Sequence, residues 1–139
     1  GRNFRMLRQA VCLVLLALPA SAQNFTSAAE VKPILQATKA SWIAVREWNG
    51  QDLIYFTHLE SWRCGLAELR YGVNGGVPEV WKMDPCFEGT AQPNAIGADR
   101  LPYVALPLGS VQRVDIMLIF DDGSTDSAGF DRAAVLMPG

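Results

Sequence analysis

The stretch Trp42-Ile-Ala-Val-Arg-Glu-Trp-Asn-Gly50 decides the fold of this chain. Its aromatic and β-branched residues favour a strand, and the Asn-Gly pair at its end is typical of the tight turn of a β-hairpin. A second run, Asp52 to Trp62, follows at once and supplies the partner strand. A two-residue turn would set Glu47 opposite Asp52, and because like charges repel across a sheet, the register stays ambiguous between this turn and a longer one.

Further hairpin signals lie downstream of this stretch. Each consists of a strand-like run, a turn rich in Gly, Asn or Asp, and an answering run. The first consists of the runs Leu66 to Val73 and Val77 to Met83 around a turn over 74–76. The second consists of the runs Val111 to Phe120 and Phe130 to Met137 around a turn over 121–124. Together they predict a mainly β fold, an antiparallel β-sandwich that is immunoglobulin-like by its number of strands. No particular family is indicated.

One short helix is predicted ahead of the strands. Ser27 and Glu30 have the spacing of a capping box, and Val31 and Leu35 recur with a helical period. Pro33 falls inside this pattern, so the helix is expected to begin near Pro33 or to bend there.

The first 22 residues predict a secretory signal peptide. Basic residues around Met6, a possible true start, precede an apolar run over 10–18 and the small-residue cleavage pattern Ala20-Ser21-Ala22. The run is too short to span a membrane, so no stable membrane anchor is expected after cleavage. The predicted organisation is therefore a signal peptide over 1–22 and a single exported domain over 23–139, periplasmic or secreted.

Cleavage makes the chain acidic. The predicted signal peptide carries three arginines and no acid, so its removal leaves nine Lys and Arg side chains against fourteen acidic ones, a formal charge of −5. A domain with this charge is not expected to bind nucleic acid or an anionic membrane, because both are themselves negative.

Two cysteines, Cys64 and Cys86, remain after cleavage. In an oxidising compartment an isolated pair is most simply a disulfide, and no C-x-x-C motif or neighbouring histidine indicates a metal or redox site. Cys86 lies in the Pro- and Gly-rich segment Asp84 to Leu108, which forbids long regular elements and leaves room for a short strand near residues 101–106. The disulfide is expected to staple this connection to the sheet.

His58 is the single histidine of the chain and the centre of an enzymatic alternative. If residues 52–62 form one strand, its alternation places Asp52, His58 and Glu60 on the same face. His58 with Glu60 or Asp52 would then supply the acid and base of a small periplasmic hydrolase or metal-dependent enzyme. No nucleophile motif accompanies them, so we assign no catalytic residue and expect a hydrogen-bonded structural histidine.

The acidic segment Asp121 to Asp126 has a superficial likeness to a calcium-binding loop. Its spacing does not match that of a calcium loop, and the bidentate glutamate at the twelfth position is lacking. A turn between two strands explains the segment, so neither a metal nor a cofactor is expected.

Aromatic and arginine side chains indicate a binding surface, because such residues are enriched at protein interfaces and stack on sugars. The candidate binding residues are Trp42, Arg46, Trp48, Trp62 and Trp81. Strand alternation would place Trp42, Arg46 and Trp48 in one stripe. The competing explanation is that large aromatic residues fill the core.

The favoured hypothesis is therefore a non-catalytic exported domain that binds a protein or glycan partner. The contact surface would be a sheet face rich in aromatic and arginine residues, or the 84–108 connection. Arg63, Arg70 and Tyr71 add to the content that motivates this hypothesis.

Overall fold

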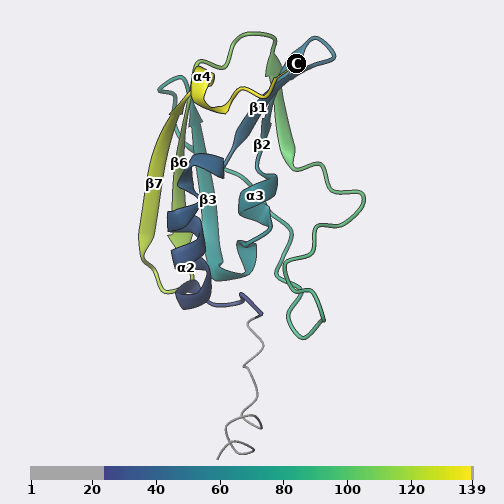
Figure 1. Ribbon diagram of the computed structural model, residues 1–139, viewed down its shortest axis with the longest axis vertical. Coiled ribbons are helices and arrows are strands. Elements are labelled where there is room, and N and C mark those ends of the chain that lie inside the picture. The colour runs from purple at the N-terminus through teal and green to yellow at the C-terminus, as the bar shows by residue number, and fades with distance from the viewer. Residues whose placement is uncertain (1–23, 139) are drawn as a thin grey trace, which may run out of the picture.

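A computed structural model describes residues 24–138 as two antiparallel sheets with short helices beside them (Figure 1). The predicted fold class, mainly β, is confirmed, whereas the predicted signal peptide lies outside the described residues. One sheet has the strand order β1 (Ala44–Trp48), β2 (Gln51–Tyr55), β5 (Tyr103–Pro107). The other has the order β4 (Glu79–Val80), β3 (Leu66–Val73), β6 (Arg113–Phe120), β7 (Thr125–Asp131).

The seven strands agree in number with an immunoglobulin-like sandwich, but one strand has a different neighbour. In the constant-type immunoglobulin arrangement the fourth strand pairs with the fifth. Here β4 pairs with β3, because the tight turn around Asn74 and Gly75, both at positive φ, folds the chain directly back. The predicted strand over 77–83 is reduced to Glu79–Val80, extended by one bond from the Trp81 amide to the Leu69 carbonyl.

The β1–β2 hairpin closes with the two-residue turn Asn49-Gly50, so the longer turn that the sequence left open does not form. Both turn residues have positive φ, 51° and 74°, as a type I′ turn requires. Glu47 does lie opposite Asp52. Their repulsion is removed by Arg132, whose guanidinium donates to Glu47 Oε1 at 2.9 Å and to the two Asp52 oxygens at 2.6 and 3.1 Å.

Asp52 connects several elements through one fully buried carboxylate. Besides Arg132, its oxygens accept the backbone N–H groups of Gly109 and Val111, each at 3.0 Å. Arg132 belongs to α4 (Arg132–Val135), while Gly109 and Val111 lie in the corner between β5 and β6. The hydrogen bond from Arg132 is the main reason that the pKa of the Asp52 carboxyl is held well below its usual range.

The predicted N-terminal helix is α2 (Ala28–Ala37). Ser27 caps it: the Glu30 amide donates to the Ser27 hydroxyl, which itself donates to the Glu30 carboxylate. The helix begins five residues before Pro33 and runs through it, so it does not begin near that residue. Lys32 of α2 pairs with Asp122, and Lys39, in the 3-10 turn that follows, pairs with Asp126, which places α2 along the β6–β7 hairpin.

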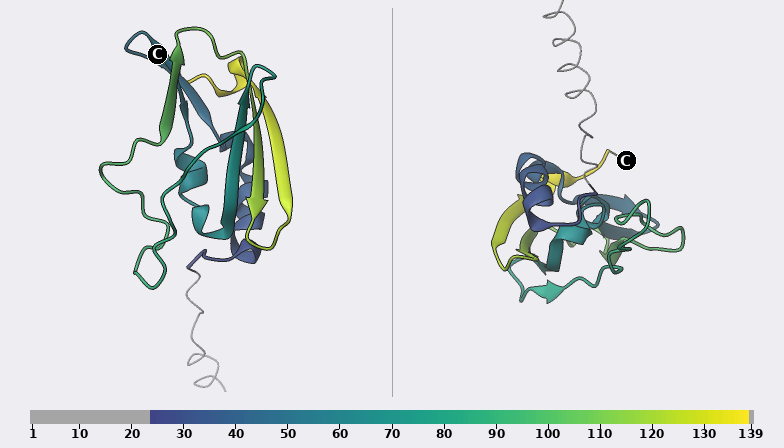
Figure 2. Two further views of the ribbon diagram at one scale, coloured as in Figure 1. Left: turned by 180° about the vertical axis from the view of Figure 1, so that it is seen from behind. Right: turned by 90° about the horizontal axis from the view of Figure 1, so that it is seen from below.

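The core fills the space between the two sheets and α2. Alternate residues of β6, from Val114 to Phe120, are buried, and their neighbours in sequence are partly or fully exposed. Trp42 is fully buried and donates its indole N–H to the Leu35 carbonyl of α2 at 2.8 Å. Figure 2 shows the strands and helices as ribbons from behind and from below.

A helix replaces the second half of the strand predicted over Asp52 to Trp62. Strand β2 ends at Tyr55, and α3 (Thr57–Glu60) follows, continuing into a 3-10 turn over Arg63–Gly65. Phe56 and Leu59, three positions apart, are both fully buried, which fits the period of a helix. Gly65 is required here, because a Cβ atom would lie 2.2 Å from the Val31 side chain of α2.

The last predicted strand, Phe130 to Met137, is also wrong. Strand β7 begins directly after the Asp-Gly turn and ends at Asp131, and residues 132–135 form α4. The small and polar residues of β7 give no apolar alternation, but its pairing with β6 satisfies the backbone groups that face β6. The chain then passes β1, where Leu136 and Val45 form a parallel bridge. No helix within residues 24–138 is long and apolar enough to cross a membrane.

Replacing Arg132 by Met tests the role of the buried pair. R132M leaves the Asp52 charge buried without its cation, so we expect a loss of about 3 kcal/mol or more in the free energy of unfolding, measured by urea denaturation at neutral pH. Adding D52N removes the uncompensated charge and is expected to restore part of that loss. Equal stabilities of R132M and the double variant would contradict this role.

Candidate functional site

The outer face of the three-stranded sheet carries an aromatic and arginine surface. The strand register places Ala44, Tyr55 and Tyr103 side by side. Trp48 lies four positions along β1 from Ala44, with Arg46 halfway between them on the same face. The alternate residues Val45 and Ile54 point to the core and are fully buried. We call Arg46, Trp48, Tyr55 and Tyr103 together the outer sheet face.

Contacts within the outer sheet face join its members in pairs. The guanidinium carbon of Arg46 lies 4.2 Å from the ring centroid of Trp48, a cation–π contact. The rings of Tyr55 and Tyr103 are 5.3 Å apart. Trp48 is 56% exposed, and aromatic side chains are enriched at binding surfaces.

A cavity of about 560 Å³ opens at one end of this face, between β1, β2 and α3. Its volume falls within the range of small-molecule sites. Apolar side chains form most of its wall, with hydroxyl, imidazole and guanidinium groups among them. The lining residues are Ser41, Trp42, Ile43, Ala44, Arg46, Tyr55, Thr57, His58, Ser61 and Met137.

His58 lies in this cavity wall, on α3, with one hydrogen-bonded ring nitrogen. Its Nε2 is 2.8 Å from Oγ1 of Thr38, the residue that ends α2. Partial burial lowers the pKa of His58, so the ring is neutral at pH 7.

The three residues of the enzymatic alternative lie in separate hydrogen-bond networks. His58 bonds to Thr38, and Asp52 bonds to Arg132. Glu60, only 1% exposed, accepts two hydrogen bonds from Arg100 and one from the indole of Trp81. The prediction that they share a strand face is wrong, because α3 turns His58 and Glu60 out of the alternation of β2.

The predicted stripe of Trp42, Arg46 and Trp48 does not form, and the other two tryptophans also lie away from the outer sheet face. Trp42 precedes β1, is fully buried and belongs to the core, so it does not line up with Arg46 and Trp48. Trp62 is partly buried and packs edge-on against Phe25. Trp81 is partly buried, and its ring centroid lies 4.6 Å from that of Phe56. The outer sheet face therefore retains only Arg46 and Trp48 of the five candidates.

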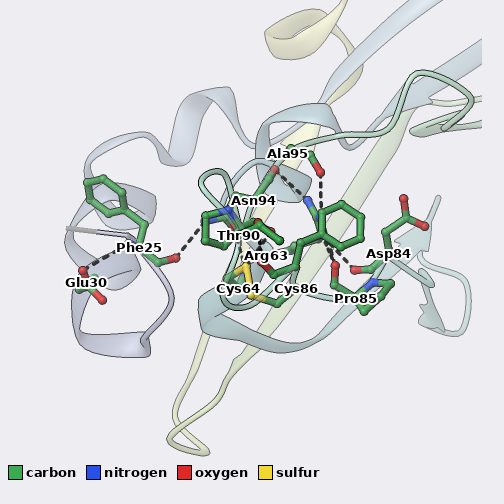
Figure 3. Close-up of a disulfide and its surroundings, with 12 residues drawn as sticks. Phe25, Glu30, Arg63, Cys64, Asp84, Pro85, Cys86, Thr90, Asn94 and Ala95 are labelled. Atoms are coloured by element: carbon green, nitrogen blue, oxygen red, sulfur yellow. Dashed lines mark hydrogen bonds between the residues drawn. A yellow bond between two sulfur atoms is a disulfide. The ribbon is translucent and has the colours of Figure 1, made fainter. Parts of the chain in front are cut away.

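The 84–108 connection is held at several points. Cys64 and Cys86 form the predicted disulfide, and Figure 3 shows Arg63 beside it with its guanidinium among backbone carbonyls. Arg63 is 3% exposed and donates to the carbonyl oxygens of Glu60, Asp84, Pro85, Asn94 and Ala95.

Hydrogen bonds and ion pairs within the chain occupy the polar side-chain groups that could otherwise bind a partner. Arg63 donates to the chain itself, and Asn94 accepts the Cys64 amide and donates to the Phe25 carbonyl. Arg70 pairs with Glu68, and Tyr71 donates to Glu79. Of the two surfaces that the sequence offered, the outer sheet face therefore has the freer side chains.

The segment Asp121 to Asp126 consists of the turn between β6 and β7, residues 121–124, and the first two residues of β7. The Asp122 carboxylate accepts the amide and hydroxyl of Ser124, and Gly123 has a φ of 83°. Asp122 also pairs with Lys32. Turn chemistry thus accounts for this segment, as predicted.

Tyr55 and Tyr103 are site residues that the sequence analysis missed. Tyr55 has the same strand parity as the exposed Gln51, so the alternation of β2 places it on the outer face. Tyr103 is brought beside it only by the pairing of β2 with β5, 48 residues away in register. Comparison with protein-family models, curated proteins and solved structures finds no match for the chain.

A pH series tests the environment of His58. Because its pKa is lowered in the fold, the unfolded chain takes up a proton first as the pH falls below the usual value of about 6.5. The free energy of unfolding is therefore expected to decrease from about pH 7.5 to 5.5, and less steeply in H58Q, which lacks this titration. Urea denaturation at each pH measures both slopes. Identical slopes would contradict the partial burial of His58.

Proposed function

We propose that the protein is an exported, non-catalytic domain that binds a glycan through the outer sheet face and its adjoining cavity. The observation that carries the proposal is the continuity of Trp48, Arg46 and the cavity on one side of a sheet. Sugar rings pack their C–H faces on aromatic rings and direct hydroxyl groups at polar partners. Trp48 supplies an aromatic ring here, and Arg46 and His58 supply polar groups.

Export is supported by the sequence pattern of residues 1–22 and by the Cys64–Cys86 disulfide, which persists in an oxidising compartment. The enzymatic alternative has less support, because His58 pairs with a threonine hydroxyl while the carboxylates of Asp52 and Glu60 pair with arginines. A protein partner at the same face is the competing binding class, and a saccharide screen distinguishes the two.

Binding of the purified protein to a panel of immobilised neutral and acidic saccharides tests the proposal. We expect binding by the natural protein and a loss of at least about fivefold in W48A, because a stacked ring contributes about one kcal/mol or more. W48A is expected to keep the stability of the natural protein, since Trp48 is exposed.

V77A is the matched control, because Val77 is 87% exposed but lies in the β3–β4 turn of the other sheet. It should bind like the natural protein. A panel without any binding saccharide, or equal loss in V77A and W48A, would overturn the proposal.

A further inference from the structure

The hydrogen bonds around Thr38 fix which nitrogen of His58 carries the proton. The Thr38 hydroxyl donates its single proton to the Ile34 carbonyl at 2.7 Å. Toward His58 Nε2, 2.8 Å away, Thr38 Oγ1 acts only as an acceptor, so Nε2 bears the hydrogen. In the neutral ring Nδ1 then carries the lone pair.

That lone pair has no partner among the described residues. No described group donates to Nδ1, and Nδ1 is not among the sealed polar atoms that lack a partner. Because His58 lines the cavity, Nδ1 offers an acceptor to a ligand hydroxyl.

Arg46 supplies the opposite kind of group. Residues 24–138 contain nine Lys and Arg side chains, and seven of them bond to carboxylates or to backbone carbonyls. The exceptions are Arg46 and Lys82. The neighbouring acid Glu47 has the other strand parity and pairs with Arg132. Arg46 thus lines the cavity with its N–H donors unused by any described carboxylate.

We propose that the cavity binds a carboxylate-bearing saccharide, with Arg46 pairing with the carboxylate and His58 Nδ1 accepting a hydrogen bond from a ring hydroxyl. This inference rests on the proposed glycan-binding function and names its ligand class. The planar guanidinium suits a carboxylate because it can form two parallel hydrogen bonds. A fatty acid would satisfy Arg46 but leave Nδ1 desolvated without a partner, which is costly.

Titration of the protein with trigalacturonate and with its methyl ester, followed by isothermal calorimetry, tests the inference. The two probes share rings and hydroxyls and differ in the charge and the methyl group at each carboxyl. We expect the acid to bind at least about tenfold more tightly than the ester, and R46M to lose that preference.

Two further variants separate the roles. K82M removes the other cation without a described partner, outside the cavity, and should keep the preference for the acid. H58Q retains a donor toward Thr38 but lacks the Nδ1 acceptor, so it should weaken acid and ester by similar factors.

Equal affinity for acid and ester, or loss of the preference in K82M as in R46M, would overturn the inference. If neither probe binds but neutral saccharides of the panel do, the inference fails and the proposed function stands. If no saccharide binds, both fail.

Discussion

The buried carboxylate of Asp52 is the constraint on which the arrangement of the two sheets depends. It receives hydrogen bonds from the Gly109 and Val111 amides and from both terminal nitrogens of Arg132. Burying a charge is expensive unless it is paired and hydrogen-bonded, and here donors from two separate parts of the chain meet that requirement. The first hairpin, the β5–β6 corner and α4 are therefore fixed relative to one another.

This joint also positions the outer sheet face. Asp52 lies on β2 between Gln51 and Leu53, so holding its side chain inward turns these two neighbours to the opposite face of the strand. The cavity is bordered by β1, β2 and α3, and His58 on α3 is tied to α2 through Thr38. The groups that would meet a ligand thus project from packed elements, which limits the entropy lost on binding.

The sequence predicted local structure better than long-range contacts. Short-range chemistry predicted the hairpin turn Asn49-Gly50, the helix cap at Ser27 and the strand Leu66–Val73. Helix α3 was missed because Leu59 and Phe56 fit an apolar strand run as well as a helix. The register of the first hairpin stayed ambiguous because Arg132, which neutralises the pair Glu47 and Asp52, lies 80 residues beyond Asp52.

For the candidate site too, the sequence predicted individual residues better than the long-range contacts that bring them together. Arg46, Trp48 and His58 were identified by residue type, but their grouping was wrong where it relied on a continuous strand through residue 62. Tyr103 joins the site only through sheet pairing across the irregular connection, which no local pattern encodes.

Native-state hydrogen exchange of the Gly109 amide tests the role of Asp52 most directly. Gly109 is an exposed turn residue, so its amide would exchange rapidly unless the Asp52 carboxylate holds it. The account predicts protection close to that of the Val111 amide and of the β6 core, lost from Gly109 in D52A. Exchange of Gly109 as fast as that of an unprotected loop amide would contradict it.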